Sequence, residues 1–415
     1  MKYKNYKFIL FFLSIGYLID FYDLTLFAVV RIPVLKSLGV PEEDFMRVGS
    51  YMFNAQALGL VLGGILSGIW SDKFGRLSAV RIGILIYSVA IITNAYVTDI
   101  TLFTIMRFLA GIGLAGEFAA SITLLSEILP AEKRGFASGF VYSFGIIGGM
   151  LAAYIGSALH WQIMFLIGGI AGIIILLARI SFADSILFKN VKAQANISRG
   201  NLKNLILNKN SFLKVITLTL SIIPFWFMAF FINFSPEVAK SVGMKEPVNQ
   251  SISLAFYFVG AFSGSYLFPY IAKLTASRKF AVLSALILML CAISLFGLGN
   301  TLNAKSFYCI LLLIGLASGY SGLFMVFAVE SFGTNQRSTA ASLISSMARC
   351  SLVGINSFVP WLAFLFSDMW IASIVAAGLF FIFGVLSLYF IKETSNKSMD
   401  FYEGLNENIP KKSLN

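Results

Sequence analysis

The sequence predicts an all-α membrane protein in which twelve transmembrane helices form two pseudo-symmetric six-helix bundles. Three observations predict this fold class: the composition, the number of long apolar spans and an internal repeat. Of the 415 residues, 58% are hydrophobic and only 12% are charged, whereas soluble domains carry about 25% charged residues. A chain this long and this apolar indicates a protein that crosses a membrane many times.

A helix needs about 20 consecutive apolar residues to cross a hydrocarbon core roughly 30 Å thick. Twelve stretches of the chain meet this requirement. Each one is continuous, whereas the strands of a membrane β-barrel would appear as alternating segments of about ten residues. The sequence therefore predicts transmembrane helices at about 8–30, 48–70, 79–97, 101–127, 137–158, 162–183, 211–234, 251–273, 279–299, 303–329, 339–366 and 369–391.

The chain also repeats itself at an offset of 203 residues. The segment 127–134 is echoed by the segment 330–337, and Gly116 maps onto Gly319. Parallel repeats of this kind are common in transporter folds. We expect an N-terminal bundle, a C-terminal bundle, a cytoplasmic linker between them and a cytoplasmic tail, at 1–183, 211–391, 184–210 and 392–415 respectively.

The basic residues are placed unevenly along the predicted topology. The formal net charge is +12, but with both termini in the cytoplasm 23 of the 31 Lys and Arg residues, Arg179 among them, face inside and six face outside. This is the positive-inside pattern of a multi-pass protein of the cell (inner) membrane. The charge therefore orients the chain in the bilayer and does not indicate nucleic-acid binding. The remaining two arginines, Arg107 and Arg349, lie within spans.

Nothing in the sequence points to a cofactor or a metal centre. Cys291, Cys309 and Cys350 all fall within spans, which argues against a disulfide framework or a metal cluster. A membrane-embedded enzyme would need a catalytic cluster at one membrane face, with His or paired carboxylates in a loop, and the predicted loops are short and lack such a cluster. We therefore expect no enzymatic activity, no cofactor and no metal, and a chain that functions as a monomer.

A short charged run lies between the second and third spans. It reads Gly68-Ile-Trp-Ser-Asp72-Lys73-Phe-Gly75-Arg76, in which glycine allows a sharp turn and Asp72 can accept hydrogen bonds from helix ends and from Arg76. The pattern G-x-x-x-D-K-x-G-R resembles the loop 2–3 signature of the major facilitator superfamily, a large class of secondary transporters. A solvated tight turn is the alternative interpretation.

Two further patterns resemble particular branches of that superfamily. The segment 127–135 reads E-x-x-P-x-x-x-R-G, which resembles the loop 4–5 signature of the sugar porters and the metabolite:proton symporters. The preceding R-x-x-x-G…G-E-F pattern, from Arg107 to Phe118, resembles helix 4 of the metabolite:proton symporters, although Ala115 replaces a glycine. The resemblance implies two bundles that rock about a central site, and proton-driven transport.

Charged residues at the inner ends of the spans are predicted to form a gate. Ion pairs between the two halves can form there in one conformation and break in the other, and a contact biases the equilibrium only by its difference between the two states. We expect these pairs to hold the outward-facing state. The predicted gating residues are Gly68, Asp72, Lys73, Gly75, Arg76, Glu127, Arg134, Glu330 and Arg337.

Three acidic residues lie inside spans of the first half. At about 1.5 Å rise per residue, Asp20 and Glu117 lie near the bilayer midplane and Asp23 lies slightly further out. Ionisable groups at this depth cost roughly 2.5–3.5 kcal/mol, so each needs a partner or a function. We predict that these three acids couple transport to protons. The alternative is structural pairing, for example of Asp23 with Arg107.

Arg349 is the strongest candidate for a substrate contact. With Ser342, Ser345 and Asn356 it forms a polar stripe at helical spacing on the eleventh span, and its planar guanidinium suits a carboxylate. The alternative is that Arg349 neutralises an acid of the first half. Other side chains predicted to line the same site are Arg107, Tyr142, Trp226, Tyr257 and Tyr320, for which helix packing is the alternative.

Together these features predict a proton-coupled importer (symporter) of a small polar organic solute bearing a carboxylate, such as an amino acid, betaine or organic acid. The alternative is a proton-driven antiporter that exports a drug, metabolite or siderophore. A channel would not need duplicated gate motifs, and a pure scaffold would not keep charged residues inside its spans. The expected partners are the substrate, protons and the lipid bilayer.

Overall fold

The structure is a computed structural model that describes residues 6–156, 159–180, 188, 199–233, 235–395 and 399–403. Within these residues the regular elements are α-helices and two short 3-10 helices, η1 (Glu42–Asp44) and η2 (Leu295–Thr301). A helix satisfies its own backbone hydrogen bonds, which is why long apolar segments adopt this form inside a bilayer.

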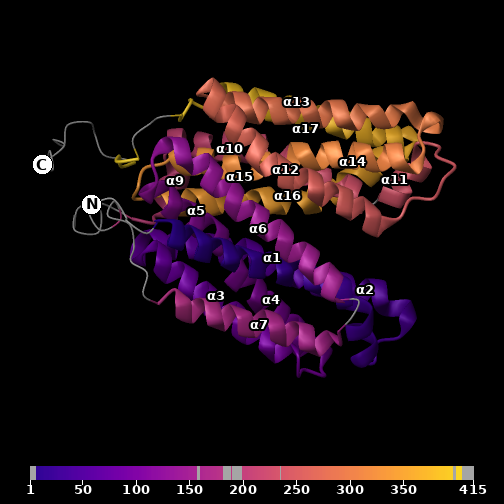
Figure 1. Cartoon of the computed structure of the whole chain (residues 1–415), viewed down its shortest axis with the longest axis horizontal. Coiled ribbons are helices and arrows are strands. Elements are labelled where there is room, and N and C mark those ends of the chain that lie inside the picture. Colours follow the sequence, from indigo (N-terminus) through magenta and orange to yellow (C-terminus); the bar gives the residue numbers. More distant parts are fainter. Residues whose placement is uncertain are drawn as a thin grey trace, which may run out of the picture.

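The helices fall into two groups (Figure 1). The first group contains α1 (Tyr6–Ser37), α2 (Phe45–Phe74), α3 (Arg76–Asn94), α4 (Ile100–Leu114), α5 (Glu117–Ile128), α6 (Ala131–Gly156) and α7 (Trp161–Ala178). After the short α9 (Leu202–Leu207), the second group contains α10 (Lys209–Asn233), α11 (Ser235–Ser241), α12 (Gln250–Thr275), α13 (Arg278–Ser294), α14 (Ala304–Ser318), α15 (Tyr320–Glu330), α16 (Arg337–Phe366) and α17 (Met369–Phe390).

Most of the predicted spans are helices of the required length and apolarity. In the part of the chain that the structure describes, eleven helical segments are long and apolar enough to cross a membrane. The remaining predicted span, 339–366, lies within α16. Most of these helices run along the long axis of the molecule (Figure 1). We name the side on which α1 begins and α17 ends the proximal side, and the opposite side the distal side.

Two of the predicted spans are each divided into two helices. The fourth breaks at Gly116, between α4 and α5, and the tenth breaks at Gly319, between α14 and α15. Both glycines lie at tight contacts: a Cβ atom on Gly116 would lie 1.7 Å from Ser67 Oγ, and one on Gly319 would lie 2.2 Å from the backbone carbon of Gly264. The breaks are therefore equivalent positions of the internal repeat.

The two groups of helices meet along two equivalent interfaces, α2 with α16 and α6 with α12. Small residues allow the close approach, as in many membrane helix pairs. A Cβ atom on Gly64 of α2 would lie 2.2 Å from Ser346 Oγ of α16, and one on Gly139 of α6 would lie 2.0 Å from the carbonyl oxygen of Ser265 of α12. The predicted gate and the predicted central site both lie along these interfaces.

Candidate functional site

The first cluster of charges on the proximal side is the Glu127 network, formed by Asp72 on α2, Arg76 on α3, Glu127 on α5 and Arg337 on α16. Glu127 Oε1 lies 2.8 Å from Arg76 Nη2 and 3.0 Å from Arg337 Nη1, and Arg76 Nη1 lies 3.3 Å from Asp72 Oδ1. All four side chains are excluded from solvent. The network joins the two halves, because Arg337 belongs to the second group of helices.

The second cluster, the Glu330 network, repeats this arrangement with the halves exchanged. Glu330 Oε1 on α15 lies 3.0 Å from Arg134 Nη1 on α6 and 3.3 Å from Arg278 Nη2 on α13. Its other oxygen, Oε2, accepts a hydrogen bond of 2.8 Å from Thr394 Oγ1 in the segment that follows α17. Each glutamate therefore binds one arginine from its own half and one from the other half.

Sequence reasoning missed Arg278. The second-half copy of the loop signature, 266–278, has lost its acid and its glycines, so nothing marked its arginine as a network member. The repeat offered one signal: the 203-residue offset maps Arg76 onto position 279, and Arg278 lies one residue before that position. The segment after α17 also joins the first cluster, because the carbonyl oxygen of Met399 accepts a hydrogen bond of 2.7 Å from Arg337 Nη2.

Asp72 contacts the beginning of α16. Gly75 is the single residue between α2 and α3, and its φ of 119° is one that residues with side chains rarely adopt. The resulting turn lets Asp72 Oδ1 accept from Ser338 N at 3.2 Å, and Oδ2 accept from both Thr339 N and Thr339 Oγ1 at 2.7 Å. A carboxylate is favourable there because the first N–H groups of a helix lack intrahelical partners.

Gly68 and Lys73 complete the predicted gating residues. A Cβ atom on Gly68 would lie 2.8 Å from Ser342 Cβ on α16, so Gly68 permits the contact that Asp72 makes one turn later. Ser342 therefore belongs to the face of α16 that packs on α2. Lys73 lines a different feature, an open recess described below. The role of all these residues as a gate remains a prediction.

Asp23 and Arg107 form an ion pair inside the first group of helices. Arg107 Nη1 lies 3.2 Å from Asp23 Oδ1, and Gln56 of α2 bridges the two, donating to Asp23 Oδ2 at 3.4 Å and accepting from Arg107 Nη2. The guanidinium also lies over the rings of Phe27 and Phe165. This geometry matches the structural alternative for Arg107. Its predicted role in substrate binding stays a prediction.

Glu117, at the first residue of α5, forms an ion pair with Arg179 Nη1. The sequence analysis placed Arg179 among the charges facing inside. Instead its side chain is fully buried in the protein, because it turns inward from the end of α7. Asp20 of α1 is also buried, and its oxygens accept no hydrogen bond from a nitrogen or hydroxyl donor of the described residues; its side-chain hydrogen-bonding neighbour is the carboxyl group of Glu117.

Arg349 lies partly buried on α16, and its Nη1 atom has no hydrogen-bond partner. In the part of the chain that the structure describes it makes no ion pair within 4.0 Å, and the groups that act on it electrostatically are Tyr17 and Asp20 of α1. Ser345, one turn before it, is partly buried. The side chain of Asn356 lies outside the described residues.

Aromatic residues from both halves gather beside Arg349 and Asp20. Tyr142 of α6 interacts with Tyr17, Tyr257 and Tyr320, which belong to α1, α12 and α15. Tyr17 also stacks on Phe118, with ring centroids 4.4 Å apart. Trp226 of α10 contacts Phe225, and Phe225 in turn contacts Tyr320 of this group. We name Tyr17, Asp20, Tyr142, Tyr257, Tyr320 and Arg349 the candidate central site. Tyr17 was not among the predicted residues.

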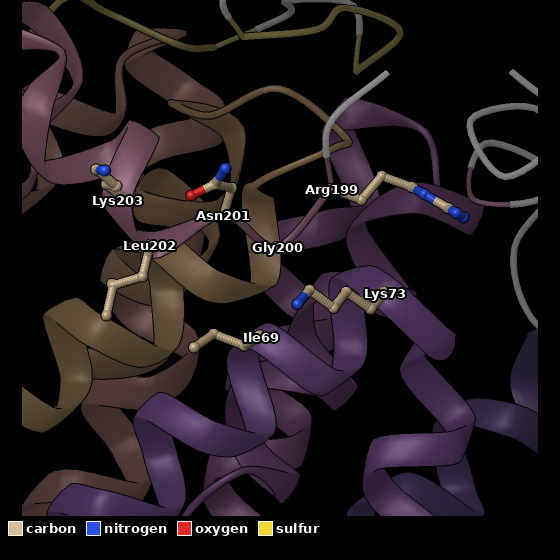
Figure 2. A pocket seen from close by; sticks show the side chains of 7 residues that line it. All are labelled: Ile69, Lys73, Arg199, Gly200, Asn201, Leu202 and Lys203. Carbon is tan, nitrogen blue, oxygen red and sulfur yellow. The ribbon is translucent and has the colours of Figure 1, made fainter. Parts of the chain in front are cut away.

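An open basic recess of about 470 Å³ lies on the proximal side, beside the turn between α2 and α3. Figure 2 shows that the ammonium group of Lys73 and the guanidinium group of Arg199 point in opposite directions. The cations therefore do not converge on one point, and the recess is separate from the candidate central site. Its lining residues are Ile69, Lys73, Arg199, Gly200, Asn201, Leu202 and Lys203.

Comparison with known protein families identifies this arrangement of helices and networks. The profile of the family described as "Major Facilitator Superfamily" matches residues 13–357. The chain belongs to the Major Facilitator Superfamily. It is therefore a multi-pass membrane protein, as the sequence analysis expected, of a family of secondary transporters.

Several transporters of organic acids are similar in sequence. The benzoate transport protein of Acinetobacter baylyi (strain ATCC 33305 / BD413 / ADP1) is 26% identical over 393 residues, which cover 83% of this chain and 80% of that protein. The putative niacin/nicotinamide transporter NiaP of Bacillus subtilis (strain 168) is 28% identical, and the sialic acid transporter NanX of Escherichia coli (strain K12) is also 28% identical. These two matches cover 46% and 41% of this chain, and 48% and 42% of the relatives.

Solved structures confirm the fold. The human organic anion transporter MFSD10 superposes with a TM-score of 0.73 at 15% identity, covering 92% of this chain and 98% of that one. The proton:xylose symporter XylE superposes with a TM-score of 0.71 at 17% identity, covering 94% of this chain and 97% of that one. The predicted all-α fold of two six-helix bundles is confirmed.

Proposed function

We propose that this transporter is a proton-coupled symporter that imports a small organic solute bearing a carboxylate. The observation that carries the proposal is Arg349, a guanidinium between the two halves that has no ion-pair partner within 4.0 Å among the described residues. A planar guanidinium can bind a carboxylate through two parallel hydrogen bonds. The similarity to transporters named for benzoate and sialic acid supports this substrate class, because both solutes carry a carboxyl group. The third relative is named for niacin, which is an acid, and for nicotinamide, which is an amide.

The proposed coupling to protons depends on the buried acidic residues Asp20, Asp23 and Glu117. Asp20 interacts electrostatically with Arg349, and its side-chain hydrogen-bonding neighbour is a second carboxyl group, that of Glu117. Two buried carboxylates side by side repel each other, and binding of a proton to one of them removes that repulsion. Asp20 therefore suits a site that loads a proton together with the substrate. Asp23 and Glu117, which have arginine partners, are the other candidates.

The gate and the membrane orientation complete the proposal. We propose that the proximal side is cytoplasmic and that the Glu127 and Glu330 networks close it, so that the structure represents a state closed to the cytoplasm. We also propose that the bundles are 1–183 and 211–391, with a linker at 184–210 and a tail at 392–415, and that the chain functions as a monomer in the cell (inner) membrane. Most of the linker and tail lie outside the described residues.

The experiment that tests the function measures uptake into proteoliposomes containing the purified protein. Labelled benzoate, nicotinate and sialate are each offered with an inward proton gradient, an outward gradient or none, and benzamide and nicotinamide serve as uncharged matched competitors. We expect accumulation of at least one carboxylate with the inward gradient only, and competition by acids but not by amides. Accumulation with the outward gradient alone would instead support the antiporter.

Replacing Asp72 with asparagine is expected to slow turnover by about tenfold or more while leaving the half-saturation concentration within about twofold. Hydrogen bonds to a charged group contribute about 1.5–3 kcal/mol to the state that contains them. The amide keeps one acceptor but presents an N–H group to the N–H groups of α16. Initial rates in proteoliposomes check this result. Asp368→Asn is the control, since Asp368 caps α17 at the distal side and asparagine caps equally well. Equal turnover in both variants would show that the Asp72 contact is not a gate.

A further inference from the structure

The end of α7 is held so that Arg179 turns into the protein. Arg81 of α3 donates to the carbonyl oxygens of Arg179 at 3.2 Å and of Ile180 at 2.9 Å, which fixes this helix end. The Arg179 side chain then reaches α1, where Nη2 donates to the carbonyl oxygens of Phe12 at 2.7 Å and Leu13 at 3.3 Å. Its Nη1 atom pairs with Glu117. Arg179 therefore ties together α1, α5 and α7.

Gly16 of α1 provides the space for this ion pair. A Cβ atom on Gly16 would lie 2.0 Å from Arg179 Nη2 and 2.1 Å from Glu117 Oε1. A side chain at this position would displace the ends of both charged side chains. The displaced atoms are the ends of flexible side chains, so the helices themselves need not move. Gly16 is thus the position at which α1 controls whether the pair forms.

Asp20 lies one helical turn after Gly16 and, unlike Glu117, forms no ion pair with Arg179 within 4.0 Å. Within the part of the chain that the structure describes, neither of its oxygens, nor Glu117 Oε2, accepts a hydrogen bond from a nitrogen or hydroxyl donor, and the two carboxyl groups are hydrogen-bonding neighbours of each other. Arg179 acts electrostatically on Asp20, but its Nη1 and Nη2 atoms are already bound to Glu117 and to backbone carbonyls. The titratable and charged groups that act electrostatically on Asp20, or on which it acts, are Tyr17, Asp23, Tyr87, Glu117, Arg179 and Arg349.

We propose that Arg179 is a positioning residue that gives the two carboxyl groups different roles: it holds Glu117 as a fixed anion and leaves the exchangeable proton to Asp20. This inference rests on the proposed proton-coupled function and names the proton carrier within it. A protonated Asp20 can donate its hydrogen to the free Oε2 of Glu117. When the proton leaves to water, Asp20 becomes an anion that Glu117 repels and Arg349 attracts. Loss of the proton therefore changes the contact between the two halves.

The test is infrared difference spectroscopy of the purified full chain in lipid nanodiscs at neutral pH, which detects protonated carboxyl groups directly and needs no substrate. We expect Asp20→Asn to remove the signal of one protonated carboxyl group and Glu117→Gln to leave that signal in place. Arg179→Gln should add a second protonated carboxyl group, so that the signal that Asp20 contributes in the native protein roughly doubles. The added signal should disappear in the Arg179→Gln, Glu117→Gln double variant.

Gly16→Ala provides a second route in case Arg179→Gln does not fold. It keeps every charge but separates Arg179 from Glu117, so it should add the same second signal. Gly378→Ala is the matched control, since a Cβ atom on Gly378 of α17 would meet nothing within 4 Å. Size-exclusion elution and thermal stability establish that each variant is folded.

Two results would overturn the inference: no added signal in either the Arg179 or the Gly16 variant, or a native signal that Glu117→Gln removes and Asp20→Asn leaves in place. The first result assigns Arg179 a structural role only, the second places the proton on Glu117, and neither affects the uptake experiment. Conversely, failure of every carboxylate to accumulate would refute the proposed function without changing these spectra.

Discussion

Replacing Asp20 with asparagine is expected to abolish accumulation driven by a pH gradient while leaving exchange of substrate across the membrane within about twofold of the native rate. One pH unit corresponds to about 1.4 kcal/mol per proton, which supports about tenfold accumulation when one proton accompanies one carboxylate. Asparagine has nearly the same shape as aspartic acid but cannot release a proton. Exchange does not require that release, so the loaded carrier should still reorient.

The measurement compares concentrative uptake and exchange in the same proteoliposomes, with benzoate or nicotinate as the labelled solute. Asp99→Asn is the matched control, because Asp99 caps α4 at the distal side. Normal accumulation in Asp20→Asn would exclude Asp20 as the coupling group. Asp23→Asn is a less informative variant, since it leaves Arg107 buried without its partner, at a cost of about 3–5 kcal/mol.

Replacing Arg349 is expected to weaken carboxylate binding strongly. Arg349→Lys keeps the charge but loses the two-pronged geometry, and should raise the half-saturation concentration by about tenfold. Arg349→Ala should raise it by about tenfold to a hundredfold, because a hydrogen bond to a charged group contributes about 1.5–3 kcal/mol. Exchange assays with labelled carboxylate measure both values. Arg47→Lys is the control, since Arg47 forms an exposed ion pair with Asp44 at 3.0 Å.

The competing explanation for Arg349 is that it serves as a structural counter-ion to Asp20. In that case the Arg349→Ala, Asp20→Asn double variant should recover exchange, because removing both charges removes the penalty of a lone buried charge. If Arg349 binds the substrate, the double variant should remain as weak as Arg349→Ala. Amides that compete as well as their acids would also show that Arg349 does not hold an anion.

Most of the fold could be predicted from the sequence, because bilayer thickness and backbone hydrogen bonding leave few possibilities for an apolar segment. The span boundaries and the parallel repeat, including the match of Gly116 to Gly319, follow from local composition and spacing. The division of two spans into α4 with α5 and α14 with α15 could not be predicted. It depends on the close approach of Gly116 to α2 and of Gly319 to α12. These are contacts between different helices, and local composition does not reveal them.

The sequence predicted most of the charged residues of the candidate site, but it did not predict which of them form ion pairs with each other. Charges inside spans are expensive, so Asp20, Asp23, Glu117 and Arg349 stood out. Arg179 did not, because an arginine at the end of a span is equally compatible with a solvated position. Arg278 was missed for the same reason. Long side chains can turn inward or outward from a helix end, and only the surrounding helices determine which direction satisfies their donors.

The sequence by itself determined that this chain spans a membrane many times, that its two halves are related, and that a few charges lie at depths where they need a partner or a function. These conclusions depend on properties that each segment carries alone: length, apolarity and spacing. Only the tertiary structure decided that Arg107 pairs with Asp23, that Arg179 pairs with Glu117 beside Gly16, and that Asp20 and Arg349 are left without ion-pair partners among the described residues. The energy of a buried charge depends on atoms a few ångströms away, and in this protein those atoms come from helices far apart in the chain.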